Sequence, residues 1–176
     1  MEILVTTKKD KILEFFLNNP TTEIHLRELS RTLHISFPWT RKLATILTKE
    51  GYLTKNRERG FVIVRAARES TLFCGLKRSY NLFSLYKSGL IEKIYEIYKP
   101  MAIILFGSFG RGEDIETSDV DIAVITTRKL SGNFEPYEKK IQRRIKLHEL
   151  SPDKINKDFW NTLANGIVLK GYLELP

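Results

Sequence analysis

The residues best suited to chemistry are two carboxylates and a glycine-rich turn in the second half of the chain. The apolar run 101–106 is short enough to be a buried strand, and the turn 107–112 follows it directly. Backbone N–H groups in such a turn can face an anion. Asp119 and Asp121 begin a second predicted strand, in which residues two apart share a face. Paired hard oxygen ligands suit Mg²⁺, which completes its coordination with water and substrate phosphates. The pattern therefore predicts one combined phosphate and metal site.

A plainer interpretation of the same residues is an ordinary hairpin, with Asp119 capping a loop and Asp121 on a solvated face. Against it, Asp121 directly precedes the apolar run 122–125. A carboxylate at the edge of a buried strand needs a partner, and a cation is the natural one. Arg111 allows two interpretations, a fork-shaped donor to phosphate or a solvated turn residue.

The segments 104–112 and 118–124 together resemble the signature of the nucleotidyltransferase superfamily that includes DNA polymerase β, and within it the minimal nucleotidyltransferases. The resemblance covers roughly residues 88–173 and implies an α+β domain with a mixed sheet flanked by helices. It implies that Gly107 and Ser108 hold the triphosphate of an NTP, expected to be ATP, and Arg111 is a candidate for a further nucleotide contact. It also implies that Asp119 and Asp121 bind Mg²⁺ and catalyse transfer of a nucleotidyl group with loss of pyrophosphate.

The resemblance also implies a third carboxylate on a neighbouring strand, where it serves the second ion of two-metal chemistry. The corresponding strand is 144–150, and the position of the third acid falls on Lys146. An ammonium there repels a metal ion. Glu149 falls on the opposite face by strand parity, whereas His148 shares the face of Lys146 and is either a base or a stacking residue. The sequence thus supports nucleotide binding more directly than turnover.

The chain has 176 residues, of which 42% are hydrophobic and 28% charged, as in ordinary globular proteins. Its organisation predicts a domain at 1–67, a helical connector at 68–99 that packs on the second domain, and a second domain at 100–176. No apolar stretch is long enough to cross a bilayer and the N-terminus lacks signal-peptide architecture, so a cytoplasmic protein without membrane contact is expected. One cysteine and three histidines exclude an internal disulfide and provide no zinc motif. Cys74 is expected to be a core thiol.

The first domain is predicted to contain helices at 8–18, 26–33 and 37–50, followed by two strands joined by a polar turn. This order resembles a winged helix-turn-helix domain, in which the third helix enters the major groove of double-stranded DNA and the hairpin contacts the backbone or minor groove. An apolar stripe is expected on the third helix at Trp39, Leu43, Ile46 and Leu47.

The net charge of +8 and pI near 9.5 are consistent with a polyanionic partner. The predicted DNA contacts lie on the third helix, opposite its apolar stripe, and on the hairpin: Ser36, Thr40, Arg41, Thr45, Lys49, Arg57 and Arg59. The alternatives are a solvated basic face, or a winged domain used for protein contact or dimerisation.

The connector is predicted to be helical, with a break at Ser88-Gly89, and it carries many aromatic residues. These residues can pack within the chain or form a homodimer contact. Residues 128–140 are predicted to be a loop leading into a short basic helix at 137–143.

Three functions remain open from the sequence. The first is an enzyme that transfers a nucleotidyl group from an NTP to an unknown acceptor, with the winged domain placing it on DNA. The second is a transcriptional regulator whose nucleotidyltransferase-like domain binds nucleotide without turnover. The third is an antitoxin-type interaction protein beside a helical HEPN partner, as the resemblance to minimal nucleotidyltransferases implies.

Overall fold

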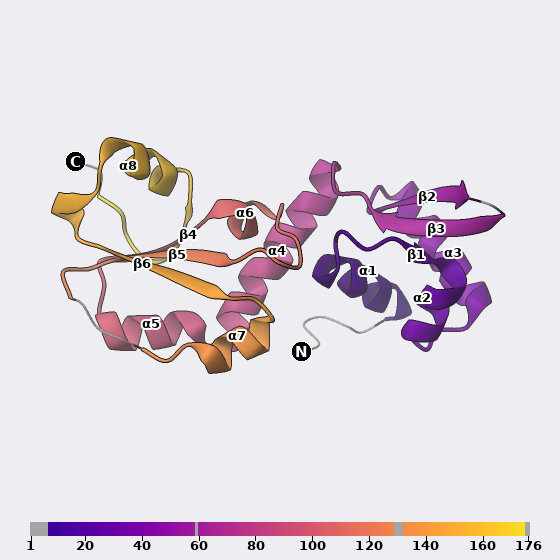
Figure 1. Cartoon of the computed structure of the whole chain (residues 1–176), viewed down its shortest axis with the longest axis horizontal. Helices are drawn as coiled ribbons and strands as arrows, with labels where there is room; N and C mark the ends of the chain where they lie inside the picture. The colour runs from indigo at the N-terminus through magenta and orange to yellow at the C-terminus, as the bar shows by residue number, and fades with distance from the viewer. Residues whose placement is uncertain (1–6, 59, 129–131, 175–176) are drawn as a thin grey trace. The chain divides into compact units, whose positions relative to one another are not determined.

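The computed structural model describes residues 7–58, 60–128 and 132–174 (Figure 1). The chain divides into two compact units at helix α4 (Thr71–Ser88), which the boundary crosses between Lys77 and Arg78. We refer to the residues up to Lys77 as the N-terminal unit and to those from Arg78 onward as the C-terminal unit, and each is described by itself.

In its described residues, the N-terminal unit contains three whole helices, the first part of α4 and a small antiparallel sheet. Helix α1 begins with a reciprocal cap, because Thr7 Oγ1 accepts the N–H of Asp10 at 3.2 Å and the Asp10 carboxylate accepts the N–H of Thr7 at 2.9 Å. The sheet has the strand order β1-β3-β2. The predicted helices and hairpin are present, whereas the two-residue strand β1 was not predicted. The elements are α1 (Lys8–Asn18), β1 (Ile24–His25), α2 (Leu26–Thr32), α3 (Phe37–Lys49), β2 (Leu53–Glu58) and β3 (Phe61–Ala66).

Helix α3 buries a different face from the predicted one. Thr40, expected on the exposed side, is fully buried, and its hydroxyl donates to the carbonyl of Ser36 at 3.2 Å. Trp39, expected in the apolar stripe, is 47% exposed and lies beneath the ammonium groups of Lys8 and Lys42, at 5.6 and 5.1 Å from its ring centroid. The buried stripe consists of Thr40, Leu43, Ala44 and Leu47.

Helix α4 does not bury its cysteine as expected. Cys74 is half-buried, and its thiol donates to the carbonyl of Arg68 at 3.1 Å. The predicted helix break is confirmed: Gly89 adopts a left-handed conformation, with φ at 80°, between α4 and helix α5 (Leu90–Tyr98).

The C-terminal unit is built on a mixed four-stranded sheet in the order β6-β5-β4-β7. Strand β5 pairs in parallel with β6 and antiparallel with β4, and β7 pairs antiparallel with β4. The short helix α6 occupies the segment expected to be a turn, and the basic helix α7 begins and ends earlier than predicted. The remaining elements are β4 (Ala102–Phe106), α6 (Gly107–Arg111), β5 (Val120–Ile125), α7 (Glu135–Ile141), β6 (Ile145–Leu150), the 3-10 turn η1 (Pro152–Lys154), α8 (Lys157–Ala164) and β7 (Ile167–Gly171).

The sheet is covered on both faces. Figure 1 shows α5 and α7 on one side of it and α8 on the other. Alternate residues of β4 and β5 divide accordingly: Leu105 and Ile122 belong to the cluster around α5, whereas Ile104 and Ala123 pack with Leu163 of α8. Asp121 follows the parity of Ala123, so its side chain lies on the α8 face. Among the described residues, no helix combines the length and apolar character needed to cross a membrane.

On the face of the sheet that α5 covers, one hydrogen bond connects α5 to the edge strand β6. The Tyr98 hydroxyl donates to the carboxylate of Glu149 at 2.7 Å, and Tyr98 is 1% exposed. This contact confirms the prediction that Glu149 faces away from Lys146. Burial, reinforced by the hydrogen bond and by the negative charge of Glu149, raises the pKa of Tyr98 to about 12 from 10.0.

We expect Tyr98 to make folding stability fall at high pH. The folded state holds the phenol proton more tightly than the unfolded chain, so this contribution is complete below pH 10.0 and is lost as pH rises through about 12. Urea unfolding of the wild type and of Tyr98→Phe across this range should show the stability advantage of the wild type shrinking. Parallel curves for the two proteins would contradict the assignment.

Candidate functional site

Three strand ends meet at one end of the sheet of the C-terminal unit. The register pairs Phe106, the last residue of β4, with Asp121 near the start of β5. It pairs Asp121 in turn with Lys146 near the start of β6. Side chains separated by up to 40 positions in the chain are thereby brought together, and Asp119 immediately precedes β5.

Gly107 lies directly against the carboxylate of Asp121. Its φ of 74° is in the left-handed region that disfavours other residues, and a Cβ atom placed on it would come within 2.9 Å of Asp121 Oδ2. Both properties require glycine here. The predicted phosphate loop and the predicted metal ligand are therefore in contact, which strand parity alone did not specify.

Asp119 forms a close ion pair with Lys146. The distance from Lys146 Nζ to Asp119 Oδ2 is 2.6 Å, with the lysine side chain 60% exposed and the aspartate side chain 25% exposed. The bond to Asp119 and its negative charge, with a smaller contribution from Asp121, raise the pKa of Lys146 above its ordinary value. The ammonium is therefore firmly protonated and is no candidate for a general base.

Asp121 contacts the other polar side chain of β6. His148 Nε2 lies 3.2 Å from Asp121 Oδ1. The imidazole ring also lies beside two aromatic rings: it meets Phe106 in an edge-type arrangement with centroids 5.1 Å apart, and it is tilted against Phe159 of α8 with centroids 6.3 Å apart. His148 thus shares the face of Lys146, as predicted, and contacts both a carboxylate and two aromatic rings.

Each of the two carboxylates keeps one oxygen that could bind a divalent ion. One oxygen of Asp119 is taken by Lys146 and one oxygen of Asp121 by His148, and no hydrogen bond from a described residue reaches the second oxygen of either. Two hard oxygen ligands next to an anion-binding loop fit Mg²⁺, which shares its coordination with substrate phosphates. No group of three or more His, Cys, Asp or Glu side chains that could hold a metal occurs among residues 7–58, 60–128 and 132–174. A fully protein-built metal cage is thus absent from this part of the chain.

The other predicted phosphate contacts differ in their surroundings. Ser108 is half-buried at the second position of α6. Arg111 is exposed, and its Nε donates to Glu113 Oε2 at 2.7 Å. Arg111 is thus paired at the surface through one of its five N–H donors.

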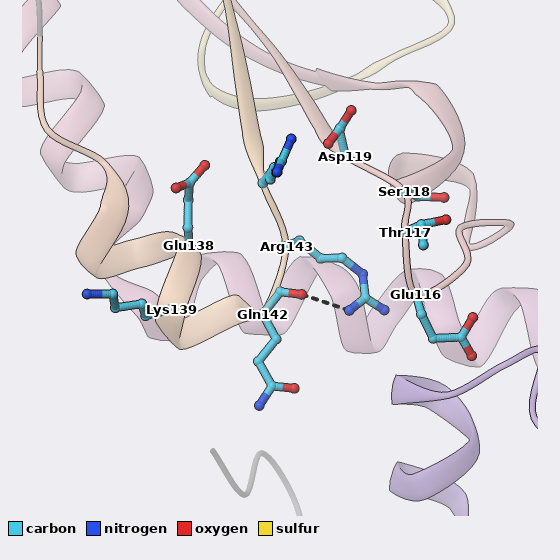
Figure 2. A pocket seen from close by; sticks show the side chains of 9 residues that line it. Glu116, Thr117, Ser118, Asp119, Glu138, Lys139, Gln142 and Arg143 are labelled. Carbon is cyan, nitrogen blue, oxygen red and sulfur yellow. Dashed lines mark hydrogen bonds between the residues drawn. The ribbon is translucent and has the colours of Figure 1, made fainter.

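A pocket of about 650 Å³ begins at Asp119 (Figure 2). Its walls are formed by residues 116–119, which precede β5, and by α7 with the residues that follow it. Figure 2 shows the Arg143 guanidinium donating to the backbone oxygen of Gln142. This pocket has no signature in the sequence, because two separate segments of the chain assemble it. Its lining residues are Glu116, Thr117, Ser118, Asp119, Glu138, Lys139, Gln142, Arg143 and Arg144.

Buried polar contacts connect α4, α6 and the segment that follows α6. Asp114 is 1% exposed and accepts the side-chain N–H of Asn81 at 2.7 Å, while Asn81 also donates to the carbonyl of Phe109 in α6 at 2.9 Å. An Arg143 guanidinium nitrogen lies 3.9 Å from the Asp114 carboxylate. Asn81 of α4 therefore holds helix α6 in position. No local sequence signal distinguishes Asp114 from the other acids of the spacer.

The predicted DNA contacts of the N-terminal unit have mixed positions. Ser36 precedes α3 and is exposed without a side-chain capping bond, and Arg41, Lys49 and Arg57 are also exposed. Thr45 is half-buried, and its hydroxyl donates to the Arg41 carbonyl and accepts from the Lys55 ammonium.

Two of the predicted DNA contacts need separate mention. Thr40 is removed from the set, because its burial leaves it no surface to contact DNA. Arg59 lies outside the described residues.

Comparison with known proteins supports the C-terminal assignment. Residues 90–171 match the family model described as Polymerase beta, Nucleotidyltransferase. A protein of Methanocaldococcus jannaschii named "Putative protein adenylyltransferase" is 40% identical over 60 residues, which make up 34% of this chain and 60% of that relative. No solved structure shows a significant match. Residues 90–171 are thus similar to nucleotidyltransferases, and the matched segment spans 60% of the length of the relative.

We expect Gly107→Ala to lower the free energy of unfolding by about 1–3 kcal/mol, because alanine is strained at this positive φ and its methyl group would meet Asp121. Gly75→Ala in α4 is the matched control, since nothing lies within 4 Å of the added methyl group, and it should not destabilise the chain. Urea denaturation followed by circular dichroism compares the two. Equal stability of Gly107→Ala and the wild type would refute the close approach.

Proposed function

We propose that this protein transfers a nucleotidyl group from ATP to an acceptor hydroxyl in a Mg²⁺-dependent reaction. The observation that carries the proposal is the contact of Gly107 with Asp121 beside Asp119, which joins an anion-binding turn to two carboxylates. The family match over residues 90–171 supports the same reaction class.

In this proposal the chain's residues orient the reactants. Backbone N–H groups at Gly107 and Ser108 bind the triphosphate, and Asp119 and Asp121 hold Mg²⁺. When bound, the ion neutralises phosphate charge and polarises the α-phosphate. His148 restrains Asp121 through the 3.2 Å contact, and its packing between Phe106 and Phe159 limits the motion of both groups.

The pocket of Figure 2 is the proposed entry for the acceptor. Asp121 borders the phosphate loop, whereas Asp119 borders the pocket, so the two carboxylates separate an ATP side from an acceptor side. The relative's printed name specifies a protein acceptor, and we extend that acceptor class to this chain. An open pocket suits a side chain presented by another macromolecule.

We further propose that the N-terminal unit is a winged helix-turn-helix domain that binds double-stranded DNA. The order α1-β1-α2-α3-β2-β3 and the exposure of Arg41 and Lys49 on α3 support it. The exposed Arg57 of β2 offers a further phosphate contact on the hairpin.

The second candidate function is a DNA-binding regulator that binds ATP without transferring it. The ion pair of Lys146 with Asp119 favours this candidate, because it places an ammonium where a third acid would assist catalysis. The two candidates share every residue of the ATP site and differ only in turnover.

We expect transfer of label from α-phosphate-labelled ATP to a macromolecule when the full chain is added with Mg²⁺ to a lysate of the source organism. Asp121→Asn should lower the labelled product at least about 100-fold, since it removes charge from a direct ion ligand. Separation of products by gel electrophoresis, with and without protease treatment, identifies the acceptor class.

Lys157→Ala is the control for this experiment, because its side chain is exposed on α8 and belongs to no part of the proposed ATP site. Equal labelling by the wild type and Asp121→Asn would overturn the transfer reaction. ATP retained by the wild type without any labelled product would favour the regulator.

We expect Arg41→Ala to weaken binding of a fluorescein-labelled random-sequence DNA duplex and to reduce its salt dependence by about one unit of slope, because one phosphate contact is lost. Fluorescence anisotropy at several salt concentrations measures both quantities. Arg68→Ala, which removes an exposed arginine outside α3 and the hairpin, should leave the slope unchanged. Binding that does not depend on salt would rule out a DNA-binding role of this kind.

A further inference from the structure

Lys146 occupies a position in the sheet from which it faces both carboxylates. Strand β6 places it directly beside Asp121 in the parallel register, and its ammonium lies 2.6 Å from Asp119 Oδ2. Lys146 therefore supplies a fixed positive charge within the proposed metal site.

The contacts of the carboxylates limit how many ions can bind. Asp119 Oδ2 is engaged by Lys146, and Asp121 Oδ1 by the imidazole of His148. One oxygen remains on each carboxylate, Oδ1 of Asp119 and Oδ2 of Asp121. Two remaining oxygens, together with phosphate oxygens and water, are a sufficient donor set for one Mg²⁺ and a poor one for two.

The balance of charge in the site also favours a single divalent ion. Three carboxylates with two divalent ions carry a single net positive charge, and so do two carboxylates with one ammonium and one divalent ion. A second divalent ion beside Lys146 would add two positive charges that no further acid balances, and it would be repelled by the ammonium at short range.

We propose that the Lys146 ammonium takes the place of a second metal ion, so that the ATP complex of this protein contains one divalent cation. The inference rests on the proposed function, because it concerns the same ATP and metal site. It reconciles the missing third acid with catalysis: Lys146 replaces the positive charge that this acid would otherwise have recruited.

Lys146 also lies beside Asp119, which borders the pocket proposed for the acceptor. In the transfer step the acceptor oxygen forms a bond to the α-phosphorus, and the bond from the α-phosphorus to the oxygen leading to the β-phosphate breaks. Pyrophosphate leaves with that electron pair, and the hydroxyl proton passes to water in the open pocket. Lys146 remains protonated and stabilises the acceptor oxygen as negative charge develops on it.

The test counts ions without any turnover. The full chain is dialysed to equilibrium against Mn²⁺ and α,β-methylene-ATP, whose α–β linkage cannot be cleaved in the transfer, and both retained species are measured per chain. We expect one Mn²⁺ per bound nucleotide for the wild type and two for Lys146→Asp. Electron paramagnetic resonance should show coupling between paired ions only in the variant.

Lys157→Asp is the matched control, because it makes the same change of charge at an exposed position of α8 and should retain one ion. Lys146→Gln tests the charge alone: it should bind the first Mn²⁺ several-fold more tightly than the wild type. Because Lys146 is exposed, Lys146→Asp and Lys146→Gln should both fold, which circular dichroism verifies.

Two ions in the wild type, or one in Lys146→Asp, would overturn the inference while leaving ATP binding intact. A wild type that retains no nucleotide would instead overturn the proposed function and the inference with it. Nucleotide and metal are counted separately, so the two failures are distinguishable.

Discussion

The parallel pairing of β5 with β6 is the constraint on which the site depends. This register places Lys146 beside Asp121 and His148 beside Ala123, which brings both polar side chains of β6 to the α8 face. A shift of one residue would exchange the faces and direct Glu149 toward the carboxylates instead. The shift is prevented from the other side of the sheet, where Tyr98 binds Glu149 and the apolar residues of β6 pack with α5. The apolar core thus determines the charge of the site.

Much of the site could be predicted because it depends on strand parity. The alternation of β6 correctly separates Glu149 from Lys146 and His148, and the apolar run of β4 correctly places Gly107 at a strand end. Contacts between distant segments could not be predicted in this way. The pairing of Asp119 with Lys146, the packing of Gly107 on Asp121 and the pocket formed with α7 all require the assembled sheet.

The buried face of helix α3 was predicted incorrectly because two neighbouring residues fit the apolar pattern. Trp39 and Thr40 are neighbours, and either can complete an apolar stripe with Leu43 and Leu47 at helical spacing. Hydrophobicity favours Trp39. The structure buries Thr40 because its hydroxyl is satisfied by the Ser36 carbonyl one turn earlier, which removes the cost of burying it. Strand β1 was missed for a simpler reason, since its two residues are too few to show a period.

The exposure of Trp39 gives the N-terminal unit an intrinsic optical reporter. Its ring is 47% exposed and lies beneath two ammonium groups, those of Lys8 and Lys42. An anion that draws either ammonium away from the ring changes the electric field at the indole and hence its fluorescence. The other tryptophan, Trp160, is half-buried in α8 of the C-terminal unit. Replacing one tryptophan at a time with phenylalanine would therefore assign a fluorescence change of the unlabelled protein to one unit or the other.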